Sequence, residues 1–231
     1  MSNKKVYFEK SREKEERNYY MMANFKCGPI SRGNFFDEEF TKKIKNKKFE
    51  DVRDIIKQKI KKDYESLTFD LDGFLRNAKK EWSKVEEEYL KKLEKIMQKP
   101  FLANKVICYS TILPRCNYWY KLPCPWFKLS ILYPKKKWNQ VCMHEIMHFM
   151  FHWHYWDSCR KHLNEEKTWH LKEALTFILN EEFSDLLKEK DIGYPPHQEL
   201  RKKLLKIWKK DKDFKSFLDK SIKVMKMWKI E

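Results

Sequence analysis

The strongest chemical signal in this sequence lies in CMHEIMHFMFHWH, at positions 142–154. His144 and His148 are four residues apart, so on a helix their imidazoles project from one face and can bind one metal ion. Glu145 lies beside His144, where its carboxylate can reach a water molecule on that metal and act as a general base. An HExxH pattern is expected only about 0.02 times in a random chain of this length and composition. We therefore predict a Zn²⁺ site formed by His144 and His148, with Glu145 as the catalytic base.

A catalytic zinc ion also needs a third protein ligand and an open position for water. The histidines that follow on the same helix suit this role poorly. His152 lies about 12 Å from His144 along a helix, which is too far for both to share one metal. His154 has the spacing of the HExxHxxGxxH pattern, but Phe151 stands where that pattern requires a glycine for a sharp turn. The third ligand must therefore come from later in the chain.

Two glutamates on the next expected helix are better placed. That segment reads WHLKEALTFILNEEFSDLL and contains Glu173 and Glu181. They lie on nearly one helical face, so their spacing alone does not choose between them. They are also about 12 Å apart, so only one of them can bind the metal. His162 and His170 are the remaining candidates.

The two segments resemble gluzincin metallopeptidases, whose third ligand is a glutamate on the helix after HExxH. LKEALT is similar to the LxEGxA pattern of many gluzincins, which implies Glu173 as the ligand. HEIMHFMFH and EALTFI are similar to the corresponding helices of ImmA/IrrE-type peptidases, although Met147 replaces the glycine of their HELGH motif. NEEFSD coincides instead with the NExxSD pattern of thermolysin-like enzymes, which implies Glu181. The resemblance spans about residues 101–190 and favours a zinc-dependent metallopeptidase with His144, His148 and Glu173 as ligands and a peptide or protein as substrate.

An alternative within the same enzyme class is a SprT-like protease, which acts on DNA-bound proteins. Such proteases also use HExxH, but their third ligand is a histidine, for which His162 or His170 would serve. The identity of the third ligand therefore separates the two hypotheses.

Two supporting roles have candidates near the second helix. Asn180 or Asp185 could orient a metal-binding histidine by a hydrogen bond. Tyr194 or His197, beyond the turn at Gly193, could stabilise a developing oxyanion.

The elements that must position these residues can be read from the spacing of apolar residues. A mixture of helices with a small sheet is typical of an α+β domain, and a zincin-like fold would place HExxH on a helix against a small mixed sheet. Trp126–Leu132 would then be the edge strand above the cleft, where an extended substrate can pair. The expected helices are 51–63, 74–97, 138–156, 169–190, 197–210 and 213–229, and the expected strands are 102–113 and 126–133.

The composition shift near residue 50 suggests two parts. Residues 1–50 are highly charged and are expected to form a partly ordered arm, followed by one metallopeptidase domain over residues 51–231. The six cysteines form no CxxC pair, so we expect free thiols in a reducing cytoplasm. No apolar segment follows the first residues as in a secretory leader, and no apolar run is long enough for a membrane span.

The net charge of +17 is typical of chains that contact polyanions, and nucleic acid is a possible partner. From Gln198 to Glu231 there are 12 Lys or Arg residues against 5 Asp or Glu. Trp208, Phe214, Phe217 and Trp228 are interleaved with them. These rings could be core residues of two helices or could stack on bases. The second case would indicate a nucleic-acid-binding protein with a non-catalytic zinc site.

Overall fold

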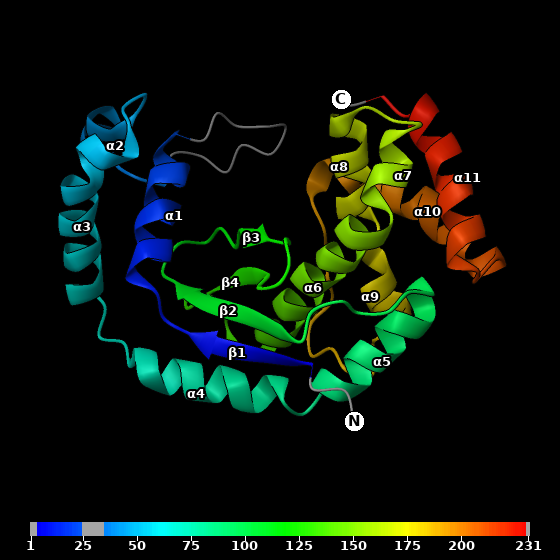
Figure 1. Ribbon diagram of the computed structural model, residues 1–231, viewed down its shortest axis with the longest axis horizontal. Coiled ribbons are helices and arrows are strands. Elements are labelled where there is room, and N and C mark those ends of the chain that lie inside the picture. Colours follow the sequence, from blue (N-terminus) through cyan, green and yellow to red (C-terminus); the bar gives the residue numbers. More distant parts are fainter. Residues whose placement is uncertain (1–3, 25–34, 230–231) are drawn as a thin grey trace.

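A four-stranded mixed sheet lies at the centre of the fold, and helices surround it (Figure 1). The computed structural model describes residues 4–24 and 35–229. The strands lie in the spatial order β1-β2-β4-β3; β1 and β4 run parallel to β2, and β3 runs antiparallel to β4. Their bounds are β1 (Lys5–Glu9), β2 (Lys105–Thr111), β3 (Tyr118–Trp119) and β4 (Trp126–Ser130). The sheet and its surrounding helices confirm the α+β class.

The edge of the sheet differs from the sequence-based expectation. The prediction that Trp126–Leu132 is an edge strand is wrong, because β4 pairs with β2 on one side and with β3 on the other. The edge is β3, which is only two residues long and lies between Pro114 and Pro123. A segment this short shows no usable alternation of apolar and polar residues.

The charged N-terminal segment belongs to the sheet and its helices rather than to a separate arm. β1 pairs in register with β2, from Lys5 beside Lys105 to Glu9 beside Tyr109. Three helices follow, α1 (Arg12–Asn24), α2 (Glu38–Ile44) and α3 (Phe49–Glu65). The domain therefore begins before residue 51. The residues between 24 and 35, including Cys27, lie outside the described part of the chain.

Polar residues on the buried face of α1 explain why this segment resembles an arm in the sequence. Glu15 accepts a hydrogen bond from the Ile112 amide at 3.0 Å, and Asn18 donates to the Thr111 hydroxyl at 3.0 Å. Both side chains are buried. Because α1 meets the sheet partly through hydrogen bonds, its sequence lacks the apolar stripe that usually marks a packed helix.

The expected helix over residues 74–97 is two helices, α4 (Leu71–Trp82) and α5 (Glu86–Met97). The apolar spacing continues across the break, since Trp82 and Tyr89 are both buried and their rings are 5.7 Å apart. Glu86 holds the break in place, because its carboxylate accepts hydrogen bonds from the Trp82 indole at 2.8 Å and from the Val6 amide at 2.6 Å. Glu86, the first residue of α5, thus ties this helix to β1.

The HExxH segment forms α6 (Trp138–His154), as expected, with the short helix η1 (Lys135–Lys137) before it and α7 (Trp156–Arg160) after it. The prediction of one helix over residues 169–190 is wrong. The chain instead forms α8 (Glu165–Ala174) and α9 (Phe177–Glu182), and no helix covers residues 183–194. The Thr176 hydroxyl, at the break, donates to the carbonyl of Glu173 at 2.9 Å.

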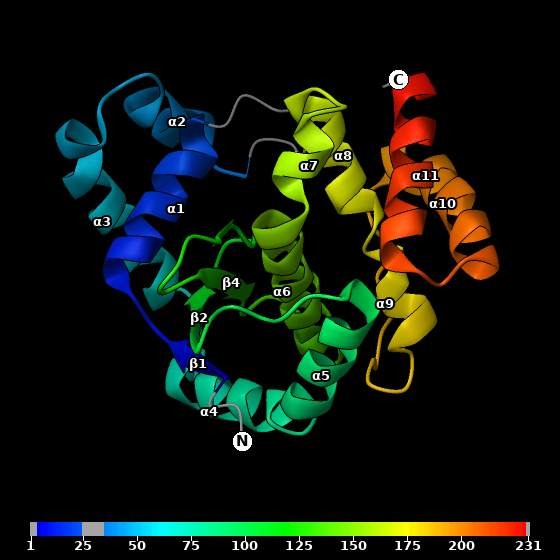
Figure 2. The same ribbon diagram turned by 45° about the vertical axis from the view of Figure 1, so that its right-hand side comes forward.

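The two basic helices at the C-terminal end are confirmed as α10 (Gln198–Lys210) and α11 (Phe214–Met227), with η2 (Pro195–His197) before them. They pack on the outer side of α8 and α9, on the opposite side of α6 from α1 to α3 (Figures 1 and 2). Trp208, Phe214 and Phe217 are at most 1% exposed and are core residues rather than stacking surfaces for bases, whereas Trp228 is half-buried against the core. No helix in the described ranges is long and apolar enough to cross a membrane.

This packing predicts a stability effect at α11. Phe217→Ala should destabilise the fold by about 3–5 kcal/mol, because it removes a buried ring from a tight cluster. Lys215→Ala, at an exposed position of the same helix, should change stability by no more than about 0.5 kcal/mol. Urea unfolding followed by circular dichroism measures both. A Phe217→Ala variant as stable as the parent would contradict the packing of α11.

Candidate metal centre

Helix α6 presents His144, Glu145 and His148 to a cleft while its other side is fixed in the core. The two apolar residues between the histidines in the motif, Ile146 and Met147, are 0% and 2% exposed. The helix is also held by the Tyr89 hydroxyl, which donates to the carbonyl of Met143 at 2.6 Å. The apolar residues inside HExxH therefore orient α6 so that its polar face lines the cleft.

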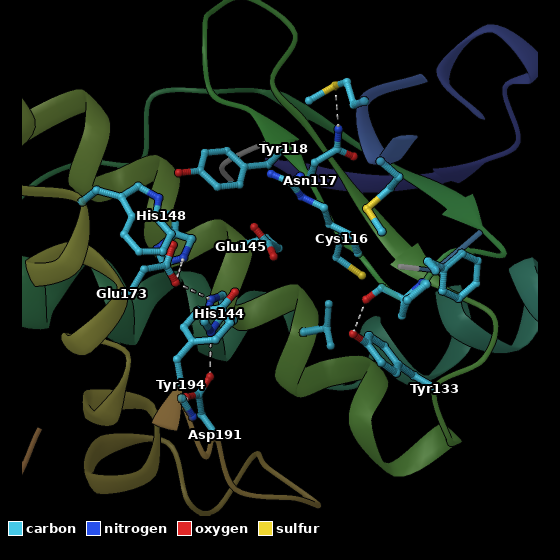
Figure 3. Close-up of a pocket in the computed structure, with 18 of the residues that line it drawn as sticks. Cys116, Asn117, Tyr118, Tyr133, His144, Glu145, His148, Glu173, Asp191 and Tyr194 are labelled. Atoms are coloured by element: carbon cyan, nitrogen blue, oxygen red, sulfur yellow. Dashed lines mark hydrogen bonds and ion pairs between the residues drawn. The ribbon is translucent and has the colours of Figure 1, made fainter. Parts of the chain in front are cut away.

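Glu173, on α8, completes a group of three donor atoms. Its Oε2 lies 3.5 Å from His144 Nε2 and 3.3 Å from His148 Nε2 (Figure 3). Ligand atoms placed tetrahedrally at the usual zinc distances are about 3.3 Å apart, so this spacing suits one zinc ion. In residues 4–24 and 35–229, no other three His, Cys, Asp or Glu side chains converge in this way. The structure brings together the ligands predicted from the sequence, His144, His148 and Glu173.

Several atoms at this point lack hydrogen-bond partners. His148 Nε2, Glu173 Oε2 and Glu145 Oε2 are buried, and none makes a hydrogen bond. Buried polar atoms are rarely left unpaired, because desolvation then goes without compensation. The unpaired atoms His148 Nε2 and Glu173 Oε2 lie 3.3 Å apart, an arrangement that a cation satisfies, so the residues fit a metal ion.

Asp191 orients the first of the two histidines. Its Oδ2 lies 2.6 Å from Nδ1 of His144, which therefore donates its proton there and leaves Nε2 free for a metal. Asp191 is held in turn by Arg201 at 3.1 Å, by the Gly193 amide at 3.0 Å and by the Gln140 amide group at 2.8 Å. This is the carboxylate–histidine pairing common at zinc sites.

The electrostatics separate the two histidines. Burial alone would lower the pKa of His144, but the Asp191 carboxylate outweighs burial and raises that pKa to about 10. Burial lowers the pKa of His148 to about 3. Burial raises the pKa of Glu145 to about 8, since its charged form loses solvation. In the metal-free protein at neutral pH, His144 is therefore the charged imidazolium and His148 is the neutral imidazole.

The alternative third ligands lie away from this point. Glu181 is on α9 and forms an ion pair with Lys209 at 3.8 Å. His162 is exposed beyond α7. His170 is buried, but its Nδ1 lies 2.7 Å from His197 Nε2, within an aromatic cluster.

The two later histidines of α6 also have other partners. His152 Nε2 lies 2.8 Å from the Tyr118 hydroxyl, and His154 Nε2 donates to the carbonyl of Pro100 at 2.8 Å. Neither belongs to the donor group, as their distance along α6 led us to expect for His152.

The supporting residues are partly those expected. Asn180 acts on His144 only through Asp191, because its side chain makes two hydrogen bonds of 2.8 Å with the backbone of Asp191. Asp185 instead pairs with Lys92 at 3.1 Å on the surface. Tyr194 lines the cleft beside His144 (Figure 3), whereas His197 is fully buried against His170.

Sequence reasoning missed Asp191 and Lys172. Asp191 follows a charged stretch that resembles a surface loop, and only its place before Gly193 suggests a turn. Lys172 stands in a lysine-rich chain, where nothing in the sequence distinguishes it from surface lysines. Both residues are buried next to the donor group.

The donor group lines a cleft of about 1180 Å³. One wall is apolar and includes Met21 and Phe36 from the N-terminal segment, and the other includes Trp169 and Tyr194. Tyr118 of the edge strand β3 also lines it. The cleft is large enough for several side chains of an extended peptide.

Comparisons with protein families, with curated proteins and with solved structures gave no match to this chain. The interpretation of the site therefore rests on its own geometry.

The donor group predicts which residues bind metal. The purified chain should contain close to one zinc ion, and His148→Ala or Glu173→Ala should lose it, because each removes one of three ligands. Glu181→Ala should retain it and serves as the matched control. Elemental analysis of protein prepared without chelators gives the result. Loss of zinc in Glu181→Ala but not in Glu173→Ala would assign the ligand to Glu181 instead.

The raised pKa of His144 predicts that metal binding depends on pH. A metal ion must displace the proton that His144 holds below about pH 10, so zinc affinity should rise about tenfold per pH unit from pH 7 to 9. Asp191→Asn removes the carboxylate that raises this pKa, so its affinity should change less over the same range. Competition with a chelator of known pH dependence measures both. A flat profile for the parent chain would contradict this proton displacement.

Proposed function

We propose that this chain is a zinc-dependent metallopeptidase that hydrolyses peptide bonds with Glu145 as the general base. The observation that carries the proposal is the convergence of His144 Nε2, His148 Nε2 and Glu173 Oε2 beside the unpartnered Glu145 Oε2. Two histidines and one carboxylate with a free position form a common ligand set of catalytic zinc sites, and the neighbouring glutamate supplies the base.

Bound zinc would lower the pKa of a water molecule and polarise the carbonyl of the substrate. Glu145 accepts the proton of the attacking water on Oε2 and passes it to the leaving amine nitrogen. Its pKa, raised to about 8 by burial in the metal-free chain, falls when a dication lies beside it, so the carboxylate is ionised when needed. Asp191 keeps the proton of His144 on Nδ1 throughout.

The cleft supports a peptide as substrate. β3 is the edge of the sheet, and Tyr118 from this strand lines the cleft. An extended chain can pair with such an edge through its backbone, and its side chains can enter the spaces on either side. The apolar wall at Met21 and Phe36 would accept large apolar side chains.

The two alternative functions have less support. A SprT-like protease requires a histidine as third ligand, and neither His162 nor His170 lies in the donor group. A nucleic-acid-binding protein would use exposed rings, but Trp208, Phe214 and Phe217 are buried. The high positive charge still suits a nucleic acid as an additional partner of the peptidase.

A reducing compartment such as the cytoplasm suits the thiol groups. Cys108, Cys124, Cys142 and Cys159, in the described part of the chain, form no disulfide.

The role of Glu145 can be separated from metal binding. Glu145→Gln should keep the zinc ion and the fold but lower the rate of peptide hydrolysis about 10²- to 10⁴-fold, because an amide cannot accept the proton. Cleavage of a pooled peptide library, followed by mass spectrometry, finds substrates and compares rates. Glu182→Gln, on α9 outside the cleft, is the matched control and should cleave like the parent. If Glu145→Gln cleaved at the parental rate, Glu145 would not be the base.

A further inference from the structure

Lys172 is a buried lysine in direct contact with the third ligand. Its side chain is 1% exposed, although it lies on α8 in a chain whose lysines mostly face solvent. Its Nζ donates to Glu173 Oε1 at 2.7 Å and to the Tyr118 hydroxyl at 2.6 Å. The ammonium group also lies 4.7 Å from the centre of the Tyr118 ring. Lysines are almost never fully buried unless paired, so this placement needs an explanation.

The two carboxylate oxygens of Glu173 have different surroundings. Oε1 is occupied by Lys172, whereas Oε2 is buried, unpaired and directed at His144 Nε2 and His148 Nε2. A free carboxylate can bind a metal through one oxygen or through both. With Oε1 engaged by a cation, Glu173 can offer only Oε2. One-oxygen binding leaves the fourth position of a tetrahedral ion open for water.

Lys172 also joins three elements of the fold. Tyr118 lies on the edge strand β3, and its hydroxyl is 2.8 Å from Nε2 of His152 on α6. The ring of Tyr118 is 5.4 Å from the ring of His148. The ammonium group on α8 thus ties the third ligand to the strand and, through Tyr118, to the helix that carries the other two ligands. This network leaves little freedom for the carboxylate to rotate.

We propose that Lys172 is a positioning residue that holds Glu173 as a one-oxygen ligand and ties it to the edge strand through Tyr118. The inference rests on the metal-binding part of the proposed function, but not on peptide hydrolysis. It predicts that loss of the ammonium group changes how the metal is coordinated, while the metal still binds.

Cobalt(II) reports this directly, because four-coordinate cobalt absorbs visible light more strongly than five-coordinate cobalt. The full-length chain, stripped of metal and loaded with Co²⁺, should show the strong bands of a four-coordinate site. In Lys172→Met, Glu173 is free to bind with both oxygens, and the bands should weaken several-fold. Lys172→Arg should restore much of the intensity, because a guanidinium can still donate to Oε1.

Lys167→Met is the matched control. Lys167 lies on the same helix and donates to the carbonyls of Met225 and Lys226 on the far side from the cleft. Its loss should leave the cobalt spectrum unchanged even if it lowers the melting temperature. A purely structural role of Lys172 would likewise move the melting temperature but not the spectrum. If Lys172→Met does not fold by circular dichroism, Lys172→Ala replaces it, because alanine has no donor for Glu173 Oε1 and leaves room for water beside the Tyr118 hydroxyl.

The outcomes separate the two ideas. If the parent chain binds no cobalt, the proposed function fails. If the parent shows a four-coordinate spectrum and a folded Lys172→Met or Lys172→Ala variant shows the same spectrum, the positioning role of Lys172 is wrong while the metal site stands. A weakened spectrum that Lys172→Arg restores supports the proposal.

Discussion

Three carboxylates are buried around one pair of histidines, and the surrounding structure offsets their charge. Glu145, Glu173 and Asp191 are 6%, 5% and 2% exposed. Ionised groups in such a place cost several kcal/mol each unless cations and hydrogen bonds compensate. Lys172 faces Glu173, and Arg201 faces Asp191. Glu173 Oε2 and Glu145 Oε2 have no hydrogen-bond partner, and a metal ion held by His144, His148 and Glu173 would complete the compensation.

This requirement for compensation brings distant parts of the chain together. Arg201 belongs to α10, and it reaches the Asp191 carboxylate at 3.1 Å and the Thr176 hydroxyl at 2.8 Å. Helix α10 therefore supports the candidate metal centre, and at least one of its basic side chains has a partner inside the protein. Helix α8 contributes both the ligand and its cation at adjacent positions, 172 and 173.

The sequence predicts those parts of the site that local geometry determines. Two histidines and a glutamate in HExxH need only one helix to meet, so His144, Glu145 and His148 follow from spacing. Glu173 could be chosen over Glu181 only by resemblance, because the decisive feature is a break in the helix near Thr176. Asp191 lies 47 residues from its partner His144, and no local pattern encodes that contact.

The fold shows the same division between local and distant determinants. The last two helices have clear apolar spacing, and the structure confirms them. Helix α1 escapes detection because its inner face carries Glu15 and Asn18, which form hydrogen bonds with Ile112 and Thr111 about a hundred positions away. Burial through hydrogen bonds leaves no apolar periodicity, so such elements are visible only once their partners are known.

The pairing of β1 with β2 has a consequence for the order of folding. Lys5 lies beside Lys105, so the first strand cannot find its neighbour until about a hundred further residues are available. Closing such a long loop is slow, because its entropy cost precedes any stabilising contact. During synthesis on the ribosome, β1 would stay unpaired while the helices between β1 and β2 form. Helix α1 follows β1 and packs beside the sheet, so the wall of the cleft that it provides would assemble only after β2 is available. The cleft would therefore form late in folding.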